Sequence, residues 1–322
     1  MTGVHSPGPR AAKAHSDRGQ LLFIGVSTSG SSIMELFPRW AQILSLDASI
    51  EGRDIPLGAE PDAYVRTVGE IGDDPGIVGA LVTTHKVAVY EHAGSLFGSL
   101  DRYARLCREI SCISKGDGVL VGHAKDPITA GRAMDHMLGI DYWRDRQADV
   151  LCMGAGGAGT AITVRLLTGK HGPARIVVTD VEPARIESLA AICQKLEAPA
   201  VQLVLVSGPE ETEALLTELR PESVVVNATG MGKDLPGSPV SDTANFPPRA
   251  VVWDLNYRGE LAFLRLARQR ADELGLRIHD GWRYFLHGWT EVIAEVYALD
   301  LTPSLFERMA RAAEPLRPSP PP

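Results

Sequence analysis

Short apolar runs alternate with amphipathic segments along most of the 322-residue chain. In the first part, apolar runs predict strands at 21–26 and 76–84, and helical spacing predicts helices at 33–46 and 99–110. Pro38 lies inside the first of these helices, where its missing N–H predicts a kink or a late start. Gly116-Asp117-Gly118 predicts a hairpin turn between two short strands. The mixture of strands and helices predicts an α/β domain.

A more regular pattern begins near residue 127, where strands that are apolar throughout alternate with helices. The strands are expected at 148–153, 175–180, 201–207, 223–230, 250–257 and 276–281, and the helices at 128–139, 160–170, 184–196, 211–219 and 261–275. Strands without polar alternation are buried on both faces, which indicates a parallel sheet covered by helices on each side. This part is therefore predicted to be a doubly wound nucleotide-binding domain, and further helices follow from Tyr284.

Composition and charge narrow the classes of function. The net charge is −8, with 44% hydrophobic and 22% charged residues, which is ordinary for a globular protein. An acidic balance argues against a nucleic-acid partner, and no run is long enough to span a membrane. The four scattered cysteines have no metal-ligand spacing, so we expect no metal site and a reducing, cytoplasmic location. Residues 1–20 and 315–322 are expected to be a disordered leader and tail.

A glycine-rich turn is the strongest chemical motif. Gly154, Gly156, Gly157, Ala158 and Gly159 fit a GxGxxG pattern that follows a strand and opens a helix. Asp180 ends the next strand, where a carboxylate can accept hydrogen bonds from ribose hydroxyls and would repel a 2′-phosphate. These features predict dinucleotide binding and favour NAD over NADP, although Arg185 is a cation close by. The alternative is a turn made only for packing, or a different nucleotide.

Several segments, in one order, resemble the shikimate/quinate dehydrogenase family. Gly79–Lys86 resembles the family's GxNVTxPxK strand, although it is one residue shorter and lacks the Asn and the Pro. Gly118–Asp126 resembles the family's GxLxGxNTD segment. Three shorter matches follow, at Asn227–Gly230 (NAT), Asp254–Tyr257 (DxxY) and Asp280-Gly281 (DG). The resemblance implies a substrate-binding domain at 21–126 plus 284–314, an NAD-binding Rossmann domain at 127–283, and a cleft between them.

The resemblance also implies roles for individual residues. Lys86 and Asp126 would be a catalytic pair that handles the hydroxyl proton; without the family pattern they would be a solvated lysine and a helix N-cap. Asn227, Thr229 and Gly230 would join the glycine-rich turn in binding the cofactor. Ser31, Thr83, Tyr257 and His287 would contact the substrate. Gly288 stands at the family's substrate-binding Gln by an ungapped count, and His287 replaces it if the loop differs by one residue.

The substrate positions depart from the family. Leu81 stands where the family has Asn, Ile113 and Ser114 stand at one Asn-Thr pair, and Ala124 and Lys125 stand at another. Losing amides that bind ring hydroxyls would leave those hydroxyls buried without partners. We therefore expect shikimate and quinate to be poor substrates and a more apolar ligand to be preferred. His85, His123 and an aromatic cluster of Trp282, Tyr284, Phe285 and Trp289 are further candidates, although packing is the commoner role for such residues.

The sequence thus predicts a cytoplasmic NAD-dependent dehydrogenase that transfers hydride between nicotinamide and a small cyclic hydroxy or oxo compound. Two alternatives stay open: a non-catalytic NAD-bound sensor or regulator, and a lyase or isomerase with no net redox change. Whether the chain forms a homodimer is also open.

Overall fold

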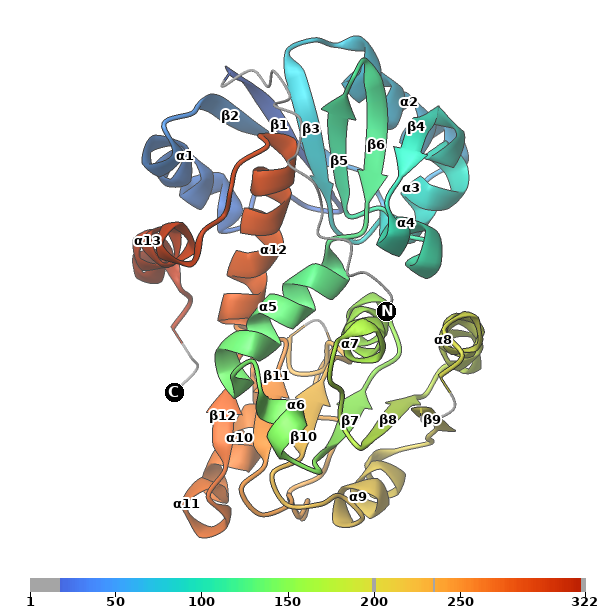
Figure 1. The fold of residues 1–322 in the computed structure, drawn as a ribbon, viewed down its shortest axis with the longest axis vertical. Coiled ribbons are helices and arrows are strands. Elements are labelled where there is room, and N and C mark those ends of the chain that lie inside the picture. The colour runs from blue at the N-terminus through green and yellow to red at the C-terminus, as the bar shows by residue number, and fades with distance from the viewer. Residues whose placement is uncertain (1–17, 199–200, 234, 320–322) are drawn as a thin grey trace, which may run out of the picture. The chain divides into compact units, whose positions relative to one another are not determined.

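A computed structural model describes residues 18–198, 201–233 and 235–319 (Figure 1). The chain divides into two compact units. The first takes in the described residues up to Ala124 and residues 289–313; the second takes in residues 125–288 and the described residues from Glu314 onward. Each unit contains a six-stranded sheet with helices, which confirms the predicted α/β class. Most of the predicted leader, residues 1–17, and residues 320–322 of the predicted tail lie outside the described residues.

The sheet of the first unit is mixed. Its strands are β1 (Arg18–Gly25), β2 (Asp47–Asp54), β3 (Ile77–Val82), β4 (Phe97–Leu100), β5 (Cys112–Gly116) and β6 (Val119–His123), in the order β2-β1-β3-β5-β6-β4. Only β5 runs antiparallel to its neighbours. The predicted hairpin turn causes this reversal: Asp117 and Gly118 both have positive φ, 50° and 79°, as a tight two-residue turn requires.

Helices cover both faces of this first sheet. They are α1 (Ile33–Leu44), α2 (Pro61–Asp73), α3 (Lys86–Ala93), the 3₁₀ turn η1 (Gly94–Leu96), α4 (Arg102–Cys107), α13 (Pro303–Ala313) and the second half of α12 (Trp282–Val296). Alternate residues of β1 face opposite sides. Leu22 and Ile24 pack in a core with α2 and α3, whereas Phe23 meets Trp289 of α12 edge to face, with ring centroids 4.9 Å apart.

Two of the expected elements differ in this unit. The predicted helix at 99–110 is instead the end of strand β4 followed by the short helix α4. Asp101 separates them because its side chain accepts the N–H of Ala104 and so begins the helix. Helix α1 runs through Pro38, and strand β1 begins at Arg18, inside the predicted leader.

The second unit has a fully parallel sheet. Its strands are β7 (Asp149–Met153), β8 (Arg175–Asp180), β9 (Val201–Leu205), β10 (Val224–Asn227), β11 (Val251–Asp254) and β12 (Arg277–His279), in the order β12-β11-β10-β7-β8-β9. The chain winds outward from β7 in both directions, which is the doubly wound order of a dinucleotide-binding fold. The point where the winding reverses lies between β7 and β10.

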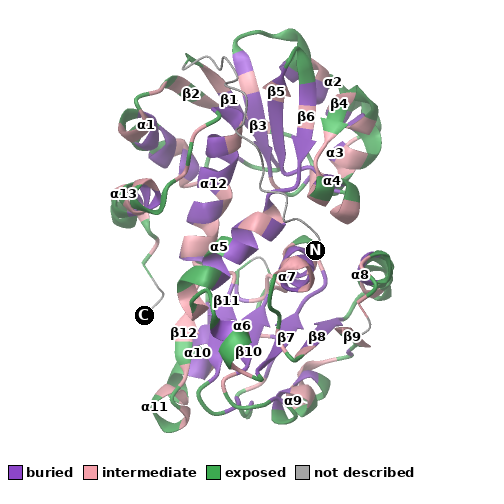
Figure 2. Ribbon diagram, viewed as in Figure 1, coloured by how far each residue is buried: buried purple, intermediate pink, exposed green. Residues whose placement is uncertain are grey.

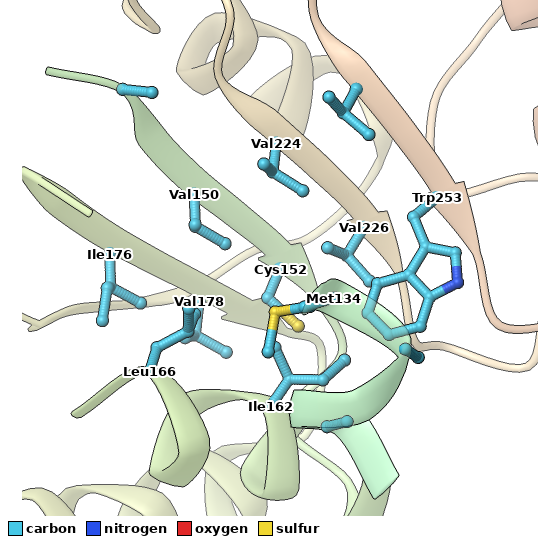
Figure 3. Close-up of a cluster of buried hydrophobic side chains, with 14 of the residues drawn as sticks. Met134, Val150, Cys152, Ile162, Leu166, Ile176, Val178, Val224, Val226 and Trp253 are labelled. Atoms are coloured by element: carbon cyan, nitrogen blue, oxygen red, sulfur yellow. The ribbon is translucent and has the colours of Figure 1, made fainter. Parts of the chain in front are cut away.

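Helices flank this sheet on its two faces. They are α5 (Asp126–Leu138), α6 (Tyr142–Asp145), α7 (Gly157–Thr168), α8 (Pro183–Lys195), α9 (Pro209–Thr217), α10 (Ala262–Gln269), α11 (Ala271–Leu274), the first half of α12 and the 3₁₀ turn η2 (Glu314–Leu316). On one face, Val150, Cys152 and Val226 pack against Met134 of α5 and Ile162 of α7 (Figure 3). Leu151, Met153 and Val225 point to the other face, in a core with α9 and α10.

The burial pattern agrees with these layers. The central strands of both sheets are largely buried, whereas the edge strands β2, β4, β9 and β12 are intermediate or exposed, as are the outer sides of the helices (Figure 2). All four cysteines have free thiols. No helix in the described part of the chain combines the length and the apolar character that a membrane crossing needs.

Candidate functional site

The glycine-rich turn lies between β7 and α7, at the reversal point of the second sheet. Gly154 has φ +105°, and a Cβ there would lie 2.7 Å from the carbonyl carbon of Ala228, so only glycine fits. A Cβ on Gly159 would lie 1.8 Å from the carbonyl oxygen of Gly154, which shows how closely α7 approaches the strand end. A Cβ on Gly156 would instead meet nothing within 4 Å.

This turn has the shape that a pyrophosphate needs. Gly156 borders open space, and it is followed directly by the N-terminus of α7, whose first N–H groups have no partner within the helix. A helix N-terminus favours negative charge. The residues present therefore fit a dinucleotide, and Gly157 and Ala158, in the first turn of α7, belong to the same surface.

Asp180 ends β8 beside this turn, but its carboxylate is engaged by the protein. Oδ2 accepts the N–H of Ala155 at 2.7 Å, and Oδ1 accepts the N–H of Glu182 at 2.9 Å. Arg185 lies 3.6 Å from Oδ1, and the side chain of Asp180 is only 3% exposed. Sequence reasoning missed this structural role, because a carboxylate at the end of the second strand can bind a ribose as well as it can bind backbone N–H groups. Glu182, by contrast, is exposed.

A buried polar network holds the turn that follows β10. The side-chain oxygen of Asn227 accepts from the N–H and the hydroxyl of Thr229, at 3.1 and 2.6 Å. Its Nδ2 donates to the carbonyl of Met231 and to Oδ1 of Asp254, both at 3.2 Å. Asn256 also donates to the Met231 carbonyl, at 2.8 Å. Asn227, Thr229 and Gly230, predicted from the motif, thus lie in one rigid turn beside Gly154.

Asp254 is the charged member of this network. It is 0% exposed, and its Oδ2 has no hydrogen-bond partner in the described part of the chain. Burial raises the pKa of Asp254 to about 7, and the nearby Asp280 adds to the rise, while hydrogen bonds from Asn256 and Asn227 oppose it. The motif located this residue, but only the structure shows the burial that raises its pKa.

Two of the predicted substrate contacts lie in the second unit. Tyr257 packs against Trp282 and Phe285, with ring centroids 5.3 and 4.9 Å apart. His287 is buried, and that burial, together with the positive charges of Arg283, His136 and Arg132, lowers its pKa to about 3. His287 is therefore a neutral imidazole that can exchange hydrogen bonds but carries no charge.

The predicted aromatic cluster needs correction. Trp282 and Phe285 do stack, with centroids 5.2 Å apart and planes 18° apart. Tyr284, however, packs against Trp253 on β11, and Trp289 packs against Phe23 in the first unit. The four rings therefore do not form one wall, because successive residues of a helix point in different directions.

The other predicted contacts follow the carboxyl ends of two neighbouring parallel strands in the first sheet. Thr83 and Lys86 follow β3, and Ser31 follows β1, which is the parallel neighbour of β3. Thr83 donates its hydroxyl to the Ile24 carbonyl at 3.2 Å. Lys86 begins α3, is half-buried, and accepts the N–H of Ile110 on its carbonyl at 3.0 Å. Asp126 begins α5 in the second unit, so the predicted pairing of Lys86 with Asp126 stays a prediction.

The surroundings of Ile113 and Ser114 do not favour the correspondence proposed for them. Ile113 packs in the core of the first unit, and the hydroxyl of Ser114 lies 2.8 Å from Nε2 of His123, so both side chains are engaged within the protein. The residue at the end of the strand is Ser111, two positions earlier. Its carbonyl accepts the N–H of Val82, and its own N–H donates to the carbonyl of His123, both at 2.9 Å. A hydroxyl therefore remains at the strand end next to β3.

Both candidate histidines are structural. His85 is 3% exposed; its Nε2 donates to the Ile55 carbonyl at 2.8 Å, and its Nδ1 lies 3.3 Å from the Tyr64 hydroxyl. His123 lies 2.8 Å from the Ser114 hydroxyl, 3.6 Å from Asp101 and 3.9 Å from Glu295.

The group around His123 has the composition of a Ser-His-Asp triad, but not its accessibility. Burial alone would raise the pKa of Asp101, yet hydrogen bonds from His123 and from the Ala104 N–H bring the pKa below its usual value. Ser114 is buried at 1% exposure, so no substrate can reach its hydroxyl. Sequence reasoning could not find this group, because its members come from β5, β6, α12 and the residue before α4. Within the described ranges, no cluster of three or more His, Cys, Asp or Glu residues could hold a metal ion.

The chain was compared with protein-family models, with curated sequences and with solved structures. No protein-family model matches the chain. It is 31% identical over 253 residues to a shikimate dehydrogenase (NADP(+)) of Methylobacterium radiotolerans, covering 77% of this chain and 80% of that protein. It is 30% identical over 226 residues to a shikimate dehydrogenase (NADP(+)) of Symbiobacterium thermophilum, covering 65% and 71%. A quinate/shikimate dehydrogenase (NAD(+)) of Corynebacterium efficiens is 33% identical over 173 residues, covering 53% and 55%.

Solved structures share the fold. Quinate dehydrogenase from Corynebacterium glutamicum in complex with NAD matches with a TM-score of 0.71 and 22% identity, covering 92% of this chain and 99% of that one. A ligand-free 5-ketofructose reductase of a Gluconobacter strain matches with a TM-score of 0.68 and 20% identity, covering 93% and 99%. At these identities the likeness concerns the fold alone.

Proposed function

Because the chain belongs to the shikimate and quinate dehydrogenase family, we propose that it transfers hydride between a nicotinamide coenzyme and a cyclic hydroxy or oxo compound other than shikimate. As a member of this family it is an NAD(P)-dependent oxidoreductase that acts on a hydroxyl group. The substrate, the coenzyme preference and the residue roles below are proposals.

The glycine-rich turn at the reversal point of the second sheet is the observation that carries the coenzyme proposal. Gly154, Gly156 and the first turn of α7 would hold the pyrophosphate, and the rigid turn at Asn227–Gly230 lies next to them. When bound, the nicotinamide ring supplies the hydride acceptor or donor. The protein contributes binding, orientation and the handling of the proton.

We propose NAD as the preferred coenzyme. Asp180 and Glu182 bring two carboxylates to the end of β8, where the adenosine ribose lies in folds of this type. Glu182 is the exposed one, so it is the better acceptor for ribose hydroxyls, and its charge would repel a 2′-phosphate. The only nearby cation among the described residues 181–185 is Arg185, which lies 3.6 Å from Asp180.

The coenzyme proposal is tested by steady-state turnover with NAD and with NADP. We expect a higher kcat/KM with NAD, and we expect the double variant Val181→Arg/Glu182→Ser to shift preference toward NADP by adding a phosphate partner and removing a charge. Better use of NADP by the unaltered chain would reject the preference.

Lys86 and Asp126 are proposed to handle the proton. Oxidation of an alcohol removes the hydroxyl proton as hydride leaves the carbon, and an amine near a carboxylate can accept that proton. Lys86, as the neutral amine, would take the proton and become an ammonium, and Asp126 would orient the lysine and stabilise the positive charge that forms. Both residues stand at the start of a helix that directly follows a strand, and both occupy matching positions in the family's motifs.

The substrate is proposed to have fewer ring hydroxyls than shikimate. Leu81 and Ala124 stand where the family has amides, and both are buried apolar side chains at strand ends. Ser31, Thr83, Ser111, Tyr257 and a neutral His287 leave polar groups for a smaller number of hydrogen bonds. A site without partners for buried hydroxyls discriminates against a polyol.

The decisive experiment is a turnover screen that follows the near-ultraviolet absorbance of reduced nicotinamide. Shikimate, quinate and cyclic alcohols and ketones with fewer hydroxyls are each tested with both coenzymes. We expect turnover with members of the last group and little with the first two. Ordinary enzymatic rates on shikimate would reject the altered specificity; substrate conversion without net coenzyme reduction would favour a lyase or isomerase; and binding without conversion would favour a sensor.

A further inference from the structure

A cavity of about 260 Å³ lies within the second unit, away from the glycine-rich turn. Its wall comes from the last turns of α5, the edge strand β12, the first turn of α12 and the side chains of Arg268 on α10 and Arg317 after η2. Apart from Trp282 and Tyr284 of the aromatic cluster, none of the residues predicted for the cofactor or substrate site lines it. β12 is separated from β7 by β11 and β10 in the sheet order.

The cavity wall carries an excess of positive charge. Three arginines, Arg268, Arg283 and Arg317, line the cavity together with one carboxylate, that of Asp280, and Arg317 also pairs with Glu314 outside the lining at 3.2 Å. Asp280 accepts a hydrogen bond from Arg317 and another from the N–H of Trp282 at 3.0 Å, so its charge is already matched. Arg268 is exposed and forms no ion pair with any described residue. A guanidinium group has a planar set of donors that suits a carboxylate.

The lowered pKa of His279, which lines the cavity, is consistent with this excess of positive charge. Burial lowers the pKa of His279, and the positive charges of Arg277 and His136 lower it further, whereas Asp280 opposes the shift. His279 and His136 both line the cavity. An anion placed here would therefore meet more positive than negative charge.

Aromatic side chains form the rest of the wall. Trp253, Trp282 and Tyr284 all line the cavity, and Trp253 meets Tyr284 at a centroid distance of 5.7 Å with planes 77° apart. Trp282 is 1% exposed, and its indole N–H has no acceptor in the described part of the chain. Buried donors are nearly always satisfied, so this N–H is a donor available to an acceptor.

We propose that this cavity binds a small aromatic carboxylate. The carboxylate would pair with Arg268 and Arg283, and the ring would lie against the aromatic wall, where a planar apolar group is favoured. The cavity is slightly smaller than typical drug-sized pockets, which matches a single ring rather than a nucleotide. This site is additional to the proposed active site and does not depend on it.

Isothermal titration calorimetry of the full chain with benzoate tests the proposal. We expect one binding site, with benzyl alcohol and sodium sulfate each binding at least about tenfold more weakly, because each lacks one half of the recognised chemistry. Absence of benzoate binding would overturn the proposal. If benzyl alcohol bound as tightly as benzoate, the carboxylate would not be recognised. If sulfate bound as tightly as benzoate, the aromatic ring would not be recognised.

Matched variants locate the site. Arg268→Gln should weaken benzoate binding by at least about tenfold. Arg265→Gln, an equally exposed arginine on α10 that does not line the cavity, should leave the affinity unchanged. Arg317→Gln should also weaken it, because Asp280 then loses its partner. Lys86→Ala should have no effect, which separates this site from the proposed catalytic residues. Equal affinity in Arg268→Gln and the parent chain would overturn the assignment.

Discussion

Asp180 and Ala155 are joined by a hydrogen bond of 2.7 Å that runs from a turn amide to a buried carboxylate. The same carboxylate accepts the N–H of Glu182, at the start of α8. Asp180 therefore fixes the glycine-rich turn relative to the end of β8. Its position gives it an influence on coenzyme binding that does not require direct contact with the ribose.

We expect Asp180→Ala to lower the free energy of unfolding by about 2–3 kcal/mol, since two hydrogen bonds to a charged group are lost. NAD and NADP should then bind more weakly by similar factors. Chemical denaturation and coenzyme titration measure both effects, with Asp272→Ala, an exposed carboxylate on α11, as the control. Stronger NADP binding with unchanged stability would instead make Asp180 a direct determinant of coenzyme choice.

Two glycines of the same turn allow a matched comparison. Gly156→Ala should fold normally, because φ there is −69° and an added Cβ meets nothing within 4 Å, yet coenzyme affinity should fall because the methyl group occupies the approach to the backbone. Gly154→Ala should lose about 1–3 kcal/mol of stability through its positive φ and its contact with Ala228. Denaturation curves and NAD titrations distinguish the two. Normal NAD affinity in Gly156→Ala would contradict the assigned cradle.

Lys86→Met tests the proposed proton carrier. Turnover of an identified substrate should fall by about 10²–10⁴-fold, the usual contribution of a positioned acid or base, while NAD affinity should be unchanged because the cradle lies in the other unit. Asp126→Asn should reduce turnover through its effect on the lysine. Lys170→Met, an exposed lysine of the second unit, serves as the control. Undiminished turnover in Lys86→Met would reject the role.

The buried carboxyl group of Asp254 predicts a pH dependence of stability. Its pKa is raised from 3.8 to about 7 in the folded chain, so the folded state keeps a proton that the unfolded state has lost. The stability contribution of this group should therefore fall as the pH rises from about 4 to about 7, by up to about 1.4 kcal/mol per pH unit.

Asp254→Asn keeps the shape of the protonated acid and cannot ionise. The variant should be more stable than the parent chain at pH 8 and should lack this part of the slope. Thermal or chemical denaturation across the pH range measures it, with Asp272→Asn as an exposed control that keeps the slope. Parallel pH profiles for the parent and Asp254→Asn would show that the carboxyl group titrates normally.

The elements of the second unit were largely predictable, because each one is indicated by the residues within and next to it. Each strand is a continuous apolar run and each helix follows within a few residues, so the strand-turn-helix signal at Met153–Gly159 could be recognised without knowing any partner. The first unit was harder. The end of β4 lies within an amphipathic segment, so helical spacing concealed it, and only the side chain of Asp101 separates the strand from helix α4.

The side-chain groups were less predictable than the elements. The correspondence of Ile113 was based on its place in a family motif, whereas the antiparallel pairing of β5 with β6 places Ser111 at the strand end. The neighbours of His123 come from residues as far away as Glu295. No pattern along the sequence reports such pairs, because their distance in space is set by the packing of separate elements.

The first unit is built from both ends of the described chain. Trp40 donates its indole N–H to the carbonyl of Met309 at 2.8 Å, and Phe23 packs against Trp289. During synthesis the residues of the second unit therefore leave the ribosome before the first unit has its closing helices, and domains generally fold as units when their chain is complete. The second unit can therefore fold first. Until the last helices are synthesised, Trp40 and Phe23 lack their packing partners, and their apolar surfaces are accessible to chaperones and to other chains.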